Sequence, residues 1–128
     1  MLTKQKGDVA LGRAIAYFLA NGFEVCLPIG DKRDYDLVIE KDGQLARVQV
    51  KYGGLYKGKT TCVVALRVMG GNQSFFTAKK CKANAFEYLF VHTAKSESYL
   101  LPWNEDIIGK STVDIEAHKY KQHKIMQG

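Results

Sequence analysis

The order of apolar and polar residues predicts a helix near the start of the chain. Apolar residues recur at helical spacing from Val9 to Leu19, and Gly22 suits the position just after a helix end. Asp8, which follows a glycine, suits the N-cap, so the predicted helix covers residues 8–21. A short strand at residues 24–28 and a charged loop at residues 30–34 should follow it.

Residues 35–51 then read as a β-hairpin whose register can be worked out. Two apolar-rich runs flank Asp42-Gly43, the strongest short signal for a two-residue type I′ turn. Such a turn pairs Lys41 with Gln44 and, counting back along both strands, places Asp36 opposite Gln49. Lys51 lies two residues further along the same face. The other face is apolar and should meet the core; it carries Tyr35, Leu37, Ile39, Ala46, Val48 and Val50.

The remaining pattern predicts an α/β protein with a mixed sheet. A basic, glycine-rich loop at residues 51–59 leads to a strand at 60–68, a loop at 70–73 and a helix at 74–85 capped by Ser74. Strands follow at residues 88–93, mostly apolar and therefore central, and at 98–101. Residues 113–126 predict a basic helix. This order favours one domain over residues 1–128, with the first helix packed on the apolar face of the hairpin.

Composition narrows the class of partner and the compartment. The chain is 46% hydrophobic and carries 19 Lys and Arg against 13 Asp and Glu, a net charge of +6 that favours nucleic acid. Its three cysteines form no CxxC pair, and Cys26 and Cys62 lie in apolar runs, so we expect buried free thiols in a reducing compartment. The histidines lack zinc-ligand spacing. No segment has the pattern of a secretory signal or a membrane span, so we expect an intracellular protein without a membrane partner.

Asp36, Gln49 and Lys51 together suit hydrolysis of a phosphodiester. A carboxylate and an amide oxygen are hard ligands for Mg²⁺, and a lysine beside them can stabilise charge that develops on a phosphate. The other interpretation is a solvated sheet face, and Glu40 and Arg47 on the same face favour it. Spacing alone leaves both open.

The run Tyr35-Asp36-Leu37-Val38-Ile39 followed by Val48-Gln49-Val50-Lys51 resembles the D…(D/E)xK signature of the PD-(D/E)XK nuclease superfamily. Segments over residues 5–103 are similar to one branch, the group I intron homing endonucleases, with Holliday-junction resolvases as more distant relatives. The matching segments are residues 6–8, 22–25, 30–31, 88–91 and 99–102. The resemblance implies a restriction-endonuclease-like αβββαβ core, with a mixed central sheet flanked by helices. It also implies an Mg²⁺-dependent, sequence-specific endonuclease for double-stranded DNA, in which Mn²⁺ substitutes.

The resemblance assigns roles to individual residues. Asp36 matches the metal-binding acid, Lys51 the catalytic lysine, and Gln49 the second acidic position, where an amide removes one negative charge from the metal site. Relatives often place a metal-site Glu where this chain has Leu11. Asp8 lies one turn earlier and could replace that Glu as a third metal ligand. It could also serve only as the N-cap of the helix, which is the simpler role. One firm carboxylate would mean a slow nuclease or a DNA-binding protein with impaired catalysis.

Basic and polar segments are candidates for DNA contact, each with a plainer alternative. Lys57 and Lys59 lie in the glycine-rich loop; the alternative is that this loop is only a long hairpin turn without contact to DNA. Arg67, Asn72, Gln73 and Ser74 have side chains that read base edges, although Ser74 also suits a helix cap. Lys119 and Lys121 belong to the densest basic stretch, which fits phosphate contact or oligomer packing.

One active site cuts one strand, so a double-strand break needs at least two chains. We therefore expect a homodimer or a dimer of dimers on a pseudo-palindromic site. Two other functions stay open: a structure-specific nuclease that cuts DNA junctions, and a DNA-binding protein on a catalytically impaired nuclease fold.

Overall fold

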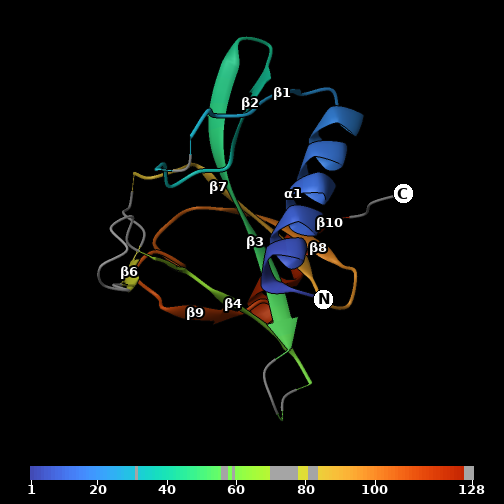
Figure 1. Ribbon diagram of the computed structural model, residues 1–128, viewed down its shortest axis with the longest axis vertical. Coiled ribbons are helices and arrows are strands. Elements are labelled where there is room, and N and C mark those ends of the chain that lie inside the picture. The colour runs from blue at the N-terminus through green and yellow to red at the C-terminus, as the bar shows by residue number, and fades with distance from the viewer. Residues whose placement is uncertain (31, 56–57, 59, 70–77, 81–83, 126–128) are drawn as a thin grey trace.

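One long helix covers one face of a mixed sheet, and shorter strands fold over the other face (Figure 1). The computed structural model describes residues 1–30, 32–55, 58, 60–69, 78–80 and 84–125, with backbone alone at 67–69 and 78–80. Its elements, in chain order, are α1 (Thr3–Ala20), β1 (Glu24–Cys26), β2 (Leu37–Lys41), β3 (Gln44–Leu55), β4 (Cys62–Ala65), β5 (Arg67–Met69), β6 (Ala78–Lys80), β7 (Tyr88–Thr93), β8 (Ser98–Pro102), β9 (Thr112–Asp114), the 3₁₀ helix η1 (His118–His123) and β10 (Lys124–Ile125).

The hairpin of β2 and β3 has the register that the sequence predicts. Lys41 pairs with Gln44 and Leu37 with Val48. Asp42 and Gly43 both have positive φ, 53° and 82°, as a type I′ turn requires. β3 then runs on beside β7 in parallel, while the other pairings along the sheet are antiparallel, in the order β1-β2-β3-β7-β8-β10. This confirms the predicted mixed sheet with residues 88–93 at its centre.

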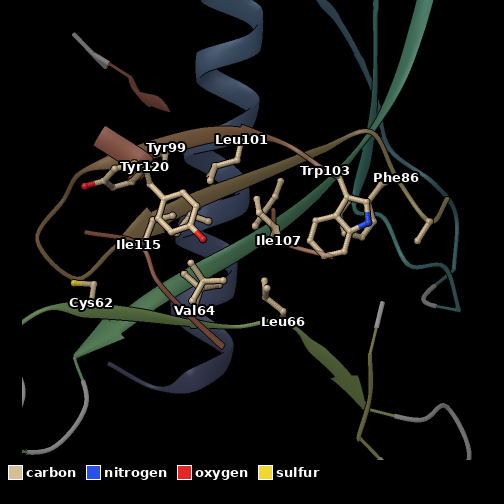
Figure 2. Close-up of a cluster of buried hydrophobic side chains, with 14 residues drawn as sticks. Cys62, Val64, Leu66, Phe86, Tyr99, Leu101, Trp103, Ile107, Ile115 and Tyr120 are labelled. Atoms are coloured by element: carbon tan, nitrogen blue, oxygen red, sulfur yellow. The ribbon is translucent and has the colours of Figure 1, made fainter. Parts of the chain in front are cut away.

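The two faces of the sheet bury two separate apolar clusters. On the helix face, Ala10, Ala14 and Phe18 of α1 pack on the hairpin and β7, as the pattern predicts. On the other face, Cys62 and Val64 of β4 point toward side chains of β8 and of the segments after it (Figure 2). β3 therefore lies between two layers. The first cluster is completed by Leu37, Ile39, Val48, Val50 and Phe90.

The structure corrects the predicted ends of several elements. α1 begins at Thr3, with Leu2 at the N-cap, so Asp8 is inside the helix and does not cap it. The Gln5 side chain accepts a hydrogen bond from the Leu2 N–H and so caps the first turn. The helix therefore begins five residues before the predicted start. Gly22, at φ 83°, takes the predicted position after the C-cap. Cys26 is exposed instead of buried, while Cys62 is buried as expected, and both are free thiols.

Two predicted helices are also wrong where the structure describes them. Within the predicted helix at residues 74–85, residues 78–80 form β6, which pairs with β5, and residues 84–85 lie in a turn; the rest is outside the described residues. In place of the predicted helix at residues 113–126, the described part, up to residue 125, belongs to β9, η1 and β10, because Ile115 and Tyr120 are buried in the cluster under β4. No helix among the described residues has the length and apolar character that crossing a membrane requires.

The glycines after Lys51 belong to a strand and not to a loop. Gly53 and Gly54 lie in β3, where Gly53 pairs with β7 and Gly54 with β4. Gly53 is buried, and a Cβ there would lie 3.4 Å from methyl groups of Val64 and Val91. The role of this glycine is close packing between strands.

These two glycines give a matched test of strand packing. A methyl group added at Gly54 would meet no other atom within 4 Å, so Gly54→Ala should raise the free energy of unfolding by about 0.5–1 kcal/mol through lower entropy of the unfolded chain. Gly53→Ala should raise the free energy of unfolding by less, because its added methyl group would meet the side chains of Val64 and Val91. Urea denaturation measures both. A loss of stability in Gly54→Ala would mean that this part of β3 is not a regular strand.

Candidate functional site

Asp36 lies at the open end of the hairpin, directly before β2. Its backbone N–H donates a hydrogen bond to the Val48 carbonyl oxygen at 2.8 Å. Its Oδ2 accepts one from the Val50 N–H at 2.7 Å. The side chain thus takes the place of the next backbone pairing of the hairpin, which fixes the carboxylate against β3.

Burial raises the pKa of the Asp36 carboxyl above its ordinary value of 3.8. The hydrogen bond from Val50 and the positive charge of Lys51 both lower this pKa, but they do not offset the cost of burial. The ionised carboxylate is therefore under-stabilised where it lies. A cation bound at this position would stabilise it further.

Gln49 and Lys51 belong to β3, the strand against which the Asp36 carboxylate is held. They share one face of the strand, opposite Val48 and Val50, and pair in register with Leu89 and Val91 of β7. Gln49 is buried, and its Nε2 donates to the Val50 carbonyl oxygen at 3.5 Å, so the amide oxygen is the atom that would coordinate a cation. Lys51 is half-buried, and its charge acts on Asp36. The structure thus places Asp36 against Val48 and Val50, on either side of Gln49, and within reach of the Lys51 charge; the predicted pairing of Asp36 with Gln49 itself is not formed, because strand pairing ends at Leu37–Val48.

A cavity of about 290 Å³ opens beside Asp36. One of its walls is Leu11 of α1, so the helix reaches the hairpin end at the position where the sequence resemblance implies a metal-site acid. Arg33 also lines the cavity and was not predicted as a site residue, although it lies only three residues before Asp36 in a charged loop. The full lining is Leu11, Leu27, Pro28, Gly30, Arg33, Tyr35 and Asp36.

Asp8 is exposed on α1, one turn before Leu11, and is not among the residues that line this cavity. Its role as a metal ligand stays a prediction. Among the described residues, no three His, Cys, Asp or Glu side chains gather closely enough to hold a metal ion. A cation beside Asp36 would therefore depend on amide, water or substrate oxygens for its other ligands.

Arg47 supports the site from the neighbouring part of β3. Its Nε lies 3.2 Å from both carboxylate oxygens of Glu87, and its Nη2 donates to the Asn84 carbonyl oxygen at 2.9 Å. This hydrogen-bonded ion pair lowers the pKa of Glu87. The guanidinium carbon also lies 6.0 Å from the centre of the Tyr35 ring. Arg47 thereby ties the residue before Asp36 and the start of β7 to the hairpin.

The candidate DNA-binding residues are only partly placed. Lys57, Lys59, Asn72, Gln73 and Ser74 lie outside the described residues, and for Arg67 only the backbone, in β5, is described. Lys119 and Lys121 are exposed on η1, whose Tyr120 packs in the cluster beneath β4. Neither lysine lines the cavity at Asp36.

A larger cavity, of about 450 Å³, lies at the turn end of the hairpin. Its walls are mainly apolar, among them Phe18, Phe23 and Leu100, and Glu87 in its lining is already paired with Arg47. Lys41 also lines it, but its Nζ donates to the Asn21 carbonyl oxygen, so both charged groups of this cavity already have partners within the protein. Size therefore does not identify the site here.

Comparison with known proteins gives the fold and the family of the chain. A solved structure of a bacterial homing endonuclease, I-Ssp6803I, is similar, with a TM-score of 0.71 and 25% sequence identity over 100% of this chain and 80% of that chain. The likeness confirms the restriction-endonuclease-like fold. No curated protein matches the sequence significantly. Residues 1–127 match the family described as PD-(D/E)XK endonuclease, and the chain therefore belongs to that family.

Proposed function

We propose that the protein is a metal-dependent endonuclease that cuts double-stranded DNA at a specific sequence, as a homing endonuclease does. The observation that carries the proposal is the fixed Asp36 carboxylate, held by the Val50 N–H at 2.7 Å with Lys51 beside it on β3. Membership of an endonuclease family and likeness to a homing endonuclease support the same reaction.

The donor set at the open hairpin end fits a hard divalent cation, with Mg²⁺ as the proposed ion and Mn²⁺ as its substitute. Burial leaves the ionised Asp36 under-stabilised, which is the condition that a bound cation relieves. Asp36 and the Gln49 amide oxygen would hold the ion. When bound, it supplies an activated water molecule and polarises the phosphoryl oxygen.

The protein's own groups would position the substrate phosphate and stabilise the charge that develops on it. The backbone contact from Val50 keeps the Asp36 carboxylate in place, so little reorganisation is needed when a phosphate arrives. The Lys51 ammonium stabilises the negative charge that grows on the phosphate in the transition state. Lys57, Lys59, Arg67, Asn72, Gln73, Ser74, Lys119 and Lys121 are proposed contacts to DNA. A pair of chains, or a dimer of dimers, would place one site on each strand.

A second candidate function is that of a DNA-binding protein with impaired catalysis. Leu11 favours it, because an apolar side chain lines the wall of the Asp36 cavity, and so does the neutral amide of Gln49. Among the described residues that line the cavity, Asp36 is the only carboxylate, so the affinity for a divalent cation should be low.

Leu11→Glu should therefore lower the metal concentration needed for half-maximal cleavage by about tenfold, because it adds a second carboxylate to the cavity. Cleavage rates over a Mg²⁺ titration measure the change. Leu11→Gln is the matched control, since it has the same shape without the charge. Equal behaviour of the two variants would show that Leu11 does not face the metal site.

The proposed function is tested by strand cleavage of a pooled random-sequence duplex library and of a mobile four-way junction, with Mg²⁺, Mn²⁺ or EDTA. Metal-dependent cutting of a defined subset of duplexes is the expected result, and it yields the target. Cutting of the junction alone would make the protein a junction resolvase. Duplex binding without cutting under all conditions would favour the impaired DNA-binding protein.

A further inference from the structure

The segment between β1 and β2 presents two exposed apolar side chains at the rim of the Asp36 cavity. Ile29 is 97% exposed, the highest value among the large apolar side chains of the described residues, and Leu27 is 58% exposed. Leu27, Pro28, Gly30 and Arg33 of this segment line the cavity together with Asp36.

An isolated exposed apolar residue is ordinary on a protein surface. Two features set Ile29 apart from the exposed Met1 and Leu2, which lie at the chain end. First, its neighbours on both sides, Pro28 and Gly30, line the cavity that holds the candidate catalytic carboxylate. Second, the chain around Ile29 is built to hold it outward.

The backbone holds Ile29 at the tip of a bend. Proline fixes its own φ and restricts the residue before it to an extended conformation, so Pro28 stiffens the approach to Ile29. Gly30 has φ 94°, a left-handed conformation that turns the chain away directly after Ile29. Isoleucine is β-branched and has few side-chain conformers. The result is an exposed apolar side chain at a bend beside the site.

The charges around this point favour an anionic partner. Residues 31–34 carry two acids, Asp31 and Asp34, and two bases, Lys32 and Arg33. Both bases are exposed, Asp34 and Asp36 are half-buried, and Asp31 lies outside the described residues. A second copy of the chain at this place would bring the same exposed cations together. A nucleic-acid duplex offers phosphates to the cations and stacked bases to the apolar tip.

We propose that Ile29, supported by Leu27, is an apolar wedge that enters the minor groove beside the scissile phosphate and partly unstacks a base step there. The inference rests on the proposed endonuclease function and adds to it a device that deforms the substrate. Apolar wedges of this kind kink a duplex and open the groove they enter. At this position the kink would turn the phosphate toward Asp36 and Lys51.

The wedge is tested with the duplex recovered from the cleavage library, carrying 2-aminopurine at the step next to the cut and studied with Ca²⁺ in place of Mg²⁺. Binding of the native protein should raise 2-aminopurine fluorescence, and Ile29→Ala should remove most of that rise. Ile29→Phe, which keeps a large apolar tip, should retain it. Leu45→Ala is the matched control, because Leu45 is 68% exposed at the far end of the hairpin.

Cleavage gives a second readout of the same idea. In Mg²⁺, Ile29→Ala should cut the fully paired duplex about tenfold more slowly and recover on a duplex with a mismatch at that step, which is already unstacked. Unchanged fluorescence and cleavage in Ile29→Ala, while the native protein still cuts, would overturn the wedge and leave the proposed function standing. A shift of Ile29→Ala from dimer to monomer in sedimentation, with normal unstacking at saturation, would make this surface a contact between copies. A native protein that neither binds nor cuts duplexes would overturn both proposals.

Discussion

Replacing Lys51 by alanine is expected to slow DNA cleavage by about a hundred- to a thousandfold, while affinity for the duplex stays nearly unchanged. Lys51 is half-buried on β3, and its charge reaches the Asp36 carboxylate. Its proposed work is done in the transition state, when charge grows on the phosphate, so removing it should affect the rate more than binding. Single-turnover cleavage and a filter-binding titration in Ca²⁺ separate the two quantities.

Lys41→Ala is the control for the loss of one positive charge. Lys41 ends β2 at the turn of the hairpin, where its Nζ donates to the Asn21 carbonyl oxygen at 3.0 Å, far along the strand from Asp36. It should cut at the native rate. A Lys51→Ala protein that cleaves normally would remove this end of the hairpin from the list of catalytic sites.

Replacing Asp36 by asparagine should abolish metal-dependent cleavage, with a loss of at least about a thousandfold, and should stabilise the folded protein at neutral pH. The activity is lost because a neutral amide replaces the carboxylate that would hold the ion. The stability rises because burial raises the pKa of Asp36 in the folded state, so the ionised form is the unfavourable one. Asparagine keeps an oxygen for the Val50 N–H without that cost.

The sign of the pH dependence follows from the raised pKa. For a carboxyl whose folded-state pKa is raised, the stabilising contribution is fully present below the unfolded-state value, 3.8, and is lost as the pH rises through the folded-state value. The gap in Tm between Asp36→Asn and the native protein should therefore be widest near pH 7 and close as the pH falls below 3.8. Asp42→Asn, at the exposed turn, is the control and should show no such trend. A gap that widens in acid would mean that Asp36 is stabilised as the ion.

The register of the hairpin could be predicted from the sequence because its geometry is local. A two-residue turn with Asp-Gly fixes the pairing, and strict alternation then assigns each side chain to a face. Lys41–Gln44 and Leu37–Val48 pair as counted. No other part of the chain is needed for this result. Before Leu37 the count fails: Asp36 bonds to Val48 and Val50 in place of pairing with Gln49, and Tyr35 packs on the opposite cluster to Leu37.

Contacts between distant segments could not be predicted in this way. The glycines at 53 and 54 read as a loop by composition, yet pairing with β7 and β4 on either side keeps them in β3. The C-terminal basic stretch has helical spacing, yet Ile115 and Tyr120 are buried over the sheet, and this packing outweighs the local pattern. The cavity wall at Leu11 and the segment around Arg33 likewise depend on how α1 and β1 fold against the hairpin.

The position of β3 between two apolar clusters has a consequence for how enzyme and substrate adapt to each other. Val48 and Val50 are buried in the cluster under α1, and Leu89 and Val91, which pair with Gln49 and Lys51, are buried in the other cluster. The backbone of β3 at the proposed site therefore has little freedom to follow a misplaced phosphate. The DNA must then be the partner that deforms when the phosphate is brought into the site. A target whose base steps yield easily would be cut faster than a stiff one with the same contacts, and the enzyme would discriminate among sequences partly by their flexibility.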